Sequence, residues 1–231
     1  MENNKKFFED NVAVIYNCKF EDIIKELSFN LIITDPPYNK KYKYPDYKDN
    51  MSDEDYINML SELNYYSSVV IHYPETFGGE LAESLGKPDK LIPWCYNTNL
   101  NRQCRLIGFY GVVPDLKKVR IPYKDMKDKR NIKLIENGSQ GAKLYDWWSD
   151  IGLVKNTSKE KLKNFTNQIP IKLLERIIIL TTNEGDVILD PFFGSGSLYF
   201  ACKNTNRKCI GIEQSRKHLE LFKERFNLKN I

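Results

Sequence analysis

The sequence predicts an α/β protein in which a mostly parallel sheet lies between two layers of helices. Short apolar, β-branched segments alternate with segments of helical periodicity, and this alternation is typical of parallel sheets. The alternation occurs in two blocks, which a polar and basic stretch at 113–165 separates. The length of 231 residues suits one domain that carries an insertion.

The first block contains predicted strands and two predicted helices. Apolar spacing indicates a helix over 20–27. Another helix is expected after Ser52, because Ser52 and Asp55 resemble a capping box ahead of an apolar face. Each predicted strand is a short apolar or β-branched run, and these runs cover 12–16, 30–34, 68–73, 91–96 and 105–110.

The second block begins at Pro170, which is favourable in the first turn of a helix. Apolar residues then share one helical face as far as Ile178. The remaining predicted elements are a strand at 186–189, a helix from about Ser197, a strand at 208–212 and a helix at about 215–226. The chain therefore divides into a first half at 1–112, an insertion at 113–165 and a second half at 166–231.

The composition excludes several classes of protein. With 35 Lys and Arg against 31 Asp and Glu, the net charge is +4, which is typical of a globular chain. No apolar run reaches about 18 residues, and the first ten residues lack a signal-peptide pattern. The five scattered cysteines form no CxxC pair, which argues against a disulfide framework and a metal centre. We expect a cytoplasmic protein that holds no metal and contacts no membrane.

Basic residues are concentrated in the insertion, where residues 117–133 hold eight Lys or Arg and two Asp or Glu. Such segregation favours contact with a polyanion, and the alternative is a solvated, lysine-rich surface. A second run at 40–48 alternates basic residues with Tyr42, Tyr44 and Tyr47, which suits phosphate contact and base stacking. The candidate nucleic-acid-binding residues are Lys40, Lys41, Lys117, Lys118, Arg120, Lys129 and Arg130.

A glycine-rich turn, DPFFGSGS at 190–197, follows the predicted strand at 186–189. Glycines between a strand and a helix let the backbone approach a ligand closely, and the helix N-terminus favours a negative group. Glu213 closes the next strand, where an acid can accept hydrogen bonds from ribose hydroxyls. The turn lacks the patterns of a P-loop and of a dinucleotide site, so it indicates a site for a nucleoside group.

A second turn, Asp35-Pro36-Pro37-Tyr38, lies directly beyond the apolar strand at 30–34. A rigid strand-to-loop corner is the structural alternative. An exocyclic base amine is a poor nucleophile because its lone pair is delocalised, and two acceptors that bind its hydrogens can aim that lone pair at an electrophile. The Asp35 carboxylate and the Pro36 carbonyl can be these acceptors, and Tyr38 can stack on the base.

Together these motifs resemble the S-adenosylmethionine-dependent amino-methyltransferases of DNA. The order of catalytic turn, basic insertion and cofactor turn is similar to the circularly permuted β-group, in which a target-recognition region separates the two halves. Further similar segments are Leu31–Thr34, Trp94–Tyr110, Gln168–Pro170 and Ile210–Glu213. The resemblance implies a three-layer, Rossmann-like methyltransferase fold with a small inserted recognition region.

The resemblance also implies roles for individual residues. Asp35, Pro36, Pro37 and Tyr38 are the expected catalytic group. The expected contacts of S-adenosylmethionine are Asp35, Gln168, Pro170, Asp190, Pro191, Phe192, Phe193, Gly194, Ser195, Gly196, Ser197, Glu213 and Gln214. The chain departs from the family at two places: Ile169 replaces the usual lysine, and Asn17-Cys18 stands where an aspartate often lies near the cofactor's adenine.

The expected activity is the transfer of a methyl group to the N6 amine of adenine in DNA, with no covalent enzyme intermediate. Aspartate at position 35 favours adenine in this family, and no cysteine is placed as a nucleophile near the turn. N4-cytosine methylation, RNA methylation and a catalytically weak DNA-binding module stay open as alternatives. A homodimer and a cognate restriction endonuclease, as in restriction-modification systems, are left open as further partners.

Three other residues or pairs have a structural interpretation. His72 and His218 lie on a predicted strand and a predicted helix without paired spacing, so neither is expected to act in catalysis or metal binding. The pair Trp147-Trp148 is expected to pack the insertion against the core, and a wedge into DNA is the alternative.

Overall fold

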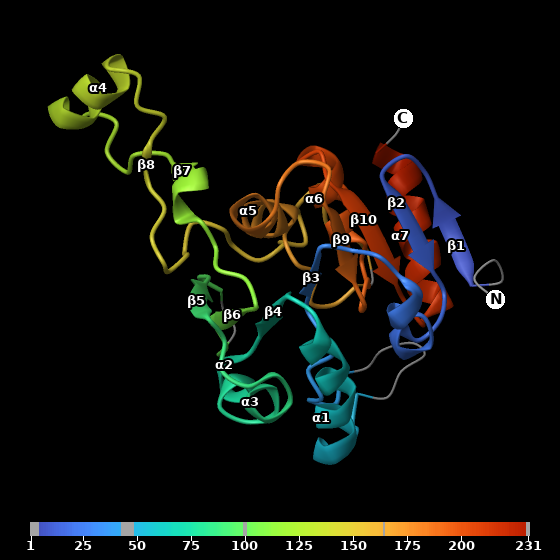
Figure 1. The fold of residues 1–231 in the computed structure, drawn as a ribbon. Helices are drawn as coiled ribbons and strands as arrows, with labels where there is room; N and C mark the ends of the chain where they lie inside the picture. Colours follow the sequence, from blue (N-terminus) through green and yellow to red (C-terminus); the bar gives the residue numbers. More distant parts are fainter. Residues whose placement is uncertain (1–4, 43–48, 99–100, 164, 230–231) are drawn as a thin grey trace.

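The computed structural model describes residues 5–42, 49–98, 101–163 and 165–229. Its main feature is an eight-stranded sheet to which both halves of the chain contribute, as Figure 1 shows. In spatial order the strands are β1 (Lys6–Glu9), β2 (Ala13–Tyr16), β10 (Lys208–Ile212), β9 (Val187–Asp190), β3 (Leu31–Thr34), β4 (Ser68–His72), β6 (Cys104–Tyr110) and β5 (Lys90–Cys95).

Five central strands, from β2 to β4, run parallel to one another. The antiparallel partners lie toward the edges, where β1 pairs with β2 and where β6 pairs with both β4 and β5. The predicted mostly parallel α/β sheet is therefore confirmed. The strand β9 of the second half lies beside β3 of the first half, so both glycine- and proline-bearing turns end up at one edge of the sheet.

The central strands are buried on both faces because their side chains alternate between two cores. Ile33 and Ile188 enter one core, while their neighbours Ile32 and Leu189 enter the other. The helices that contribute to the first core are α5 (Ile171–Thr181), α6 (Ser197–Asn204) and α7 (Arg216–Lys229). The helices that contribute to the second are α1 (Asp53–Ser61) and α3 (Glu80–Leu85).

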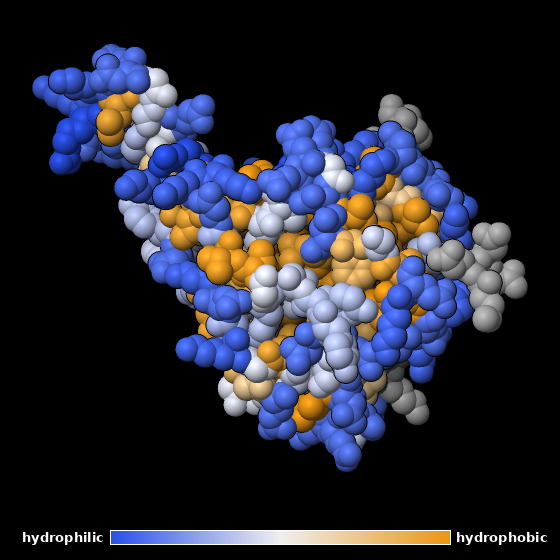
Figure 2. Space-filling model, viewed as in Figure 1, coloured by the Kyte–Doolittle hydropathy of each residue, from blue (hydrophilic) through white to orange (hydrophobic). Residues whose placement is uncertain are grey.

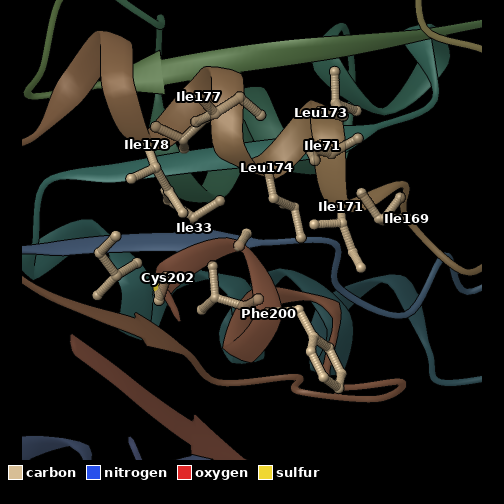
Figure 3. Packing of buried hydrophobic residues seen from close by; sticks show 14 of the residues in the cluster. Ile33, Ile71, Ile169, Ile171, Leu173, Leu174, Ile177, Ile178, Phe200 and Cys202 are labelled. Atoms are coloured by element: carbon tan, nitrogen blue, oxygen red, sulfur yellow. The ribbon is translucent and has the colours of Figure 1, made fainter. Parts of the chain in front are cut away.

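Helix α5 packs in the first core against β3, the strand that leads to the catalytic turn. Figure 3 shows Leu174, Ile177 and Ile178 of α5 packed with Ile33 of β3 in one cluster. Ile33, Ile177 and Ile178 are fully buried, and full burial of such a side chain contributes about 1.5–3 kcal/mol. Strand β3, which directly precedes Asp35, is therefore held in place by the packing of α5.

The helix predicted over 20–27 is not continuous. Two 3-10 helices, Phe20–Asp22 and Ile24–Glu26, form instead, because Ile23 leaves helical geometry with φ −140°. Phe20, Ile23 and Ile24 still face the second core, so the two short turns bury the apolar side chains that suggested a continuous helix. The helix after Ser52 is confirmed as α1, and the Ser52 hydroxyl accepts a hydrogen bond from the Asp55 amide at 3.1 Å.

The insertion at 113–165 extends from the sheet as an arm, visible in Figure 1 at the upper left. It contains the two-stranded sheet of β7 (Arg120–Ile121) and β8 (Ala142–Lys143), and α4 (Lys129–Glu136) lies at its tip. The sequence did not predict α4, which begins after Asp128, whose carboxylate accepts the Arg130 amide at 2.8 Å. No residue of α4 is buried, and Figure 2 shows a mostly hydrophilic surface there.

The arm returns to the core along the edge strand β5. The Trp148 amide donates to the Pro93 carbonyl at 2.8 Å, and the Cys95 amide donates to the Trp148 carbonyl at 2.7 Å. Trp148 is 1% exposed and belongs to the first core, whereas Trp147 is 52% exposed. The predicted packing of the insertion is therefore confirmed for Trp148 and is wrong for Trp147, because adjacent side chains of an extended segment point to opposite faces.

Five further elements, β1, α2, α3, β7 and β8, were also absent from the sequence-based expectations. Strand β1 is short and only partly buried, so it lacks a clear apolar pattern, and α2 (Pro74–Phe77) is a single turn. Within the described part of the chain, no helix is both long enough and apolar enough to span a bilayer.

Candidate active site

A cavity of about 220 Å³ opens where β3, β9 and β10 end. Three turns form its wall: the catalytic turn at 35–38, the glycine-rich turn after β9, and the segment that follows Ile212. The structure thus brings these predicted site residues together around one space: Asp35, Pro36, Pro37, Tyr38, Asp190, Pro191, Phe192, Phe193, Gly194, Ser195, Ser197, Glu213 and Gln214.

Glu213 lines the cavity. Its two carboxylate oxygens accept hydrogen bonds from the backbone amides of Gly194, at 2.9 Å, and Ser215, at 2.7 Å. Each oxygen keeps a further lone pair, so the carboxylate can still accept hydrogen bonds from vicinal ribose hydroxyls. Phe20 and Phe192 both line the same space, with their ring centroids 5.1 Å apart, and they supply an apolar wall for a planar base. The carboxylate acceptor and the apolar wall together fit the ribose and the base of S-adenosylmethionine.

Replacing Glu213 with alanine is expected to weaken S-adenosylmethionine binding by about 10- to 150-fold, because charge-assisted hydrogen bonds contribute about 1.5–3 kcal/mol. Glu220→Ala is the matched control, since Glu220 pairs with Arg216 on the exposed face of α7. Titration calorimetry with S-adenosylmethionine measures both. Equal affinities of the two variants would place the ribose contact elsewhere.

Packing against α7 requires one glycine of the glycine-rich turn, Gly196. Gly196 has φ +70°, and a Cβ there would lie 2.3 Å from the Phe222 ring of α7. Gly196 does not line the cavity, so packing accounts for this glycine in the structure, and its contact with the cofactor stays a prediction. Gly194, with φ +52°, does line the cavity. The turn is also tied down by Arg225, whose guanidinium donates to the Ser195 carbonyl at 2.9 Å.

Gly196→Ala is expected to destabilise the fold more than Gly185→Ala does. Both glycines have positive φ, but a Cβ at Gly185 would meet nothing within 4 Å. The difference between the two variants therefore measures the clash with Phe222, and overpacking of this kind costs about 1–3 kcal/mol. Denaturant unfolding gives both values, and equal decreases in stability would mean that only the backbone strain matters.

Gln168 and Pro170 do not reach the cavity. The Gln168 amide is engaged with the end of the arm: its oxygen accepts from the Leu162 amide at 2.9 Å, and its nitrogen donates to the Glu160 carbonyl at 2.7 Å. Pro170 is the N-cap residue of α5. The neighbouring residues Phe165, Thr166 and Asn167 line the cavity instead, and sequence reasoning missed them because their segment carries no periodic pattern.

Asn17 and Cys18, where the chain departs from the family, have separate roles. The Asn17 amide donates to the carbonyls of Glu213, at 2.9 Å, and Gln214, at 3.0 Å, so it orders the backbone beside the ribose end. Cys18 lines the cavity. Burial raises the pKa of its thiol to about 11, which keeps it neutral and makes it part of the apolar wall.

A chain of hydrogen bonds holds the catalytic turn from the side of β4. The Tyr56 hydroxyl donates to the Pro37 carbonyl at 2.6 Å and lies 3.0 Å from Nε2 of His72. The Tyr73 amide donates to Nδ1 of His72 at 2.8 Å. Because the Tyr56 hydroxyl donates its hydrogen bond to Pro37 and Nδ1 is an acceptor, Nε2 carries the imidazole hydrogen and donates to the Tyr56 oxygen. Burial lowers the pKa of His72 to about 3, so the ring stays neutral and its role is structural.

The Asp35 side chain is 17% exposed at the cavity wall. Burial raises its pKa to about 6, against the opposing effects of the Arg105 charge and a hydrogen bond from the Tyr38 hydroxyl. Nearby, burial raises the pKa of Asp190 to about 7. The Asp190 carboxylate accepts from the Thr34 hydroxyl at 2.8 Å, which connects the catalytic turn to the glycine-rich turn.

Tyr38 is only 2% exposed, although its backbone turn borders the cavity. Its ring centroid lies 4.5 Å from that of Tyr73 and 4.7 Å from that of His72. The ring therefore contacts protein groups in this arrangement, and the stacking on a base that we predict requires a different position of Tyr38.

The candidate nucleic-acid residues lie in two places. Lys40 and Lys41 are exposed directly after the catalytic turn, while Tyr44 and Tyr47 of the same run lie outside the described residues. The other five are exposed on the arm: Lys117, Lys118, Arg120, Lys129 and Arg130. Two of these make contacts within the protein, because Lys118 donates to the Thr182 carbonyl at 3.3 Å and Arg130 pairs with Asp128 at 3.0 Å.

Comparisons with known proteins agree with this arrangement. The family model described as DNA methylase, of the N6/N4 type, matches residues 61–224. The chain is 30% identical over 228 residues to the Type II methyltransferase M.HpaI of Haemophilus parainfluenzae, covering 88% of this chain and 70% of that protein.

Two solved structures share the fold. The cytosine-N4-specific PvuII DNA methyltransferase superposes with a TM-score of 0.67 at 16% identity, over 96% of this chain and 89% of that one. The complex of M1.HpyAVI with S-adenosylmethionine gives a TM-score of 0.61 at 23% identity, over 93% and 99%. The family match, the relative and the cavity agree on one assignment: this chain belongs to the N6/N4 family of S-adenosylmethionine-dependent DNA amino-methyltransferases.

Proposed function

We propose that this chain methylates the N6 amine of adenine in DNA. The observation that carries the proposal is the position of Asp35, which lines the same cavity as Glu213. A base amine that enters this site meets an acceptor beside the cofactor cavity. The preference for adenine rests on aspartate at position 35, and N4-cytosine methylation is the competing outcome.

The catalytic turn offers two acceptors for one amine. The Asp35 carboxylate can bind one amine hydrogen, and the Pro36 carbonyl can bind the other. The Pro37 carbonyl is engaged by Tyr56, whereas no donor among the described residues contacts the Pro36 carbonyl. The fixed φ of proline keeps that carbonyl in place, so the turn orients the amine lone pair toward the cavity with little loss of entropy at the moment of reaction.

S-adenosylmethionine supplies an electrophilic methyl group when it is bound. After transfer the amine is positively charged and therefore strongly acidic, so a strong base is not needed to remove its proton. The Asp35 carboxylate, whose pKa is about 6, can take that proton at Oδ1 or Oδ2 and release it to solvent. The chain thus acts by orienting the amine and by accepting one proton, without a covalent enzyme intermediate.

The arm supports DNA as the substrate that reaches this site. Figure 1 shows that the arm projects from the core, and its Lys and Arg candidates are exposed. Lys40 and Lys41 provide positive charge next to the catalytic turn. Phosphate contacts of this kind position a duplex without reading its sequence. In this proposal residues 113–165 are the target-recognition region, and residues 1–112 and 166–231 are the catalytic and cofactor halves.

The test is the identity of the methylated base. The full chain is expressed in cells that lack adenine methylation, and their DNA and RNA are digested and analysed by mass spectrometry. We expect N6-methyldeoxyadenosine in DNA, and none with the Asp35→Asn variant. N4-methyldeoxycytidine would overturn the base assignment and keep the mechanism, whereas methylation of RNA alone, or of neither nucleic acid, would overturn the proposal.

A further inference from the structure

Arg105 of β6 is a buried cation behind the catalytic turn. Its side chain is 3% exposed, and Nη1 lies 3.9 Å from Oδ2 of Asp35. The other carboxylate oxygen, Oδ1, accepts the hydrogen bond of Tyr38. The Asp35 carboxylate is thus flanked by a phenol on one oxygen and a guanidinium near the other, while its side chain remains partly accessible at the cavity.

Three aromatic rings surround the Arg105 guanidinium. Its central carbon lies 5.1 Å from the Tyr38 ring centroid and 5.6 Å from those of both Tyr73 and Trp94. Within the part of the chain that the structure describes, Nε and Nη1 have no hydrogen-bond partner. These two nitrogens have lost their hydration without gaining hydrogen bonds. Cation–π attraction and the Asp35 charge therefore offset the cost of burying them.

A buried arginine with so few hydrogen bonds is costly as a structural element. An apolar side chain could fill the same space between aromatic rings without that cost. Besides its attraction to the aromatic rings, this positive charge acts on the Asp35 carboxylate 3.9 Å away. The site therefore indicates a role for the charge itself.

We propose that Arg105 is a positioning residue for methyl transfer, which keeps Asp35 ionised and turned toward the base amine. The inference rests on the proposed function of Asp35 as an acceptor for that amine. A neutral carboxylic acid would present a hydroxyl on one oxygen, and this hydroxyl would compete with the amine hydrogens. Arg105 prevents this state without itself touching the base.

The surroundings of Asp35 favour protonation in the absence of Arg105. Burial raises the pKa of Asp35, and a charged Asp190 would raise it further. Lys40 and Lys41 are further cations near the turn, but both are exposed, so water and salt weaken their effect. The titratable or charged groups around Asp35 and Arg105 are Tyr38, Lys40, His72, Tyr73, Tyr96 and Asp190.

The test is the pH dependence of methyl transfer in three variants of the full chain. Arg105→Gln removes the charge, Arg105→Lys keeps it, and Arg102→Gln removes a charge at the surface. Arg102 is the matched control, because it lies 4.2 Å from the same Tyr73 ring but pairs with Glu75 on an exposed face. The profile of kcat/KM reports titration of the free enzyme.

For the wild type we expect activity to fall as pH drops through about 6, the pKa of Asp35. In Arg105→Gln the midpoint of this acid limb should rise by roughly one to three pH units, the usual effect of a neighbouring arginine on an aspartate. Arg105→Lys and Arg102→Gln should keep the wild-type midpoint. An Arg105→Gln variant that is slower by the same factor at every pH would overturn the proposal, because a purely structural role predicts that result.

A second measurement does not depend on activity. Carbon-13 NMR of aspartate-labelled protein follows the Asp35 carboxyl, assigned by its absence in Asp35→Asn. We expect an ionised Asp35 at pH 7.5 in the wild type and in Arg105→Lys, and a protonated fraction in Arg105→Gln. If the Arg105→Gln variant does not fold, the wild-type measurement still tests the inference. An Asp35 that is protonated in the wild type at pH 7.5 would overturn it. A chain that methylates no nucleic acid but shows these titrations would refute the proposed function alone.

Discussion

Asp35→Asn is expected to lower kcat for methyl transfer by at least about 100-fold, the size of effect seen when one preorganised hydrogen-bonding group is removed from an active site. Asparagine preserves the shape of the side chain, but its amide presents hydrogens where the base amine needs acceptors. The decrease should fall on kcat, because the interaction strengthens in the transition state. The affinity for S-adenosylmethionine should fall by a smaller factor, since Asp35 is also an expected cofactor contact while Glu213 and the glycine-rich turn are intact.

Asp150→Asn is the matched control for this variant. Asp150 pairs with the largely buried Arg176 at 2.5 Å, so its replacement also leaves a buried arginine without its carboxylate. It should therefore destabilise the fold without lowering kcat. Single-turnover transfer of labelled methyl to DNA measures activity, and thermal unfolding measures stability. An Asp35→Asn enzyme that keeps more than a tenth of the wild-type rate would contradict the assigned role.

Neutralising the basic residues of the arm is expected to reduce DNA affinity on the order of 100-fold at low salt, because each side chain that neutralises a phosphate releases counterions. The slope of log K against log salt should fall by about 0.9 for each phosphate that the variant no longer neutralises. The variant replaces five side chains with glutamine: Lys117, Lys118, Arg120, Lys129 and Arg130. Fluorescence anisotropy with a labelled duplex, at several salt concentrations, gives both quantities.

The control for the arm variant changes charge at the other side of the molecule. Lys217 and Lys223 lie on α7, which Figure 1 shows near β1 and β2, at the end of the sheet far from the arm. Their double replacement by glutamine should leave the salt slope unchanged. If the five-residue variant also keeps the wild-type slope, the run at 117–133 is a solvated surface and the DNA contact lies elsewhere.

Much of the fold follows from local patterns in the sequence. The strand 30–34 is apolar on both faces, and two prolines end it, so a buried strand with a functional turn at its end could be predicted from these residues alone. The glycine-rich turn and Glu213 likewise follow consecutive short strands. Such patterns act over a few residues, which is why the catalytic turn, the glycine-rich turn and Glu213 could be expected around one cavity.

Local patterns failed to predict some features, either because distant contacts outweigh local preference or because a short local signal lies within a run of other residues. The segment at 20–27 has helical spacing, yet it forms two short turns. Helix α4 makes no buried contact and begins at a local cap, Asp128, that lies within a basic run. Gly196 has the sequence context of a ligand turn, but the Phe222 ring on α7 is what leaves no room for a side chain there.

The sequence by itself determined the sheet, the two turns and the family. Tertiary structure alone decided which side chains support them. Arg105 lies 70 residues after Asp35 along the chain, and β6 places it behind that carboxylate only because β6 pairs with β4, which pairs with β3. Tyr56 of α1 likewise reaches the Pro37 carbonyl, and His72 of β4 contacts the Tyr56 hydroxyl. These contacts depend on strand order, and no pattern along the sequence encodes the distance between a buried charge and its partner.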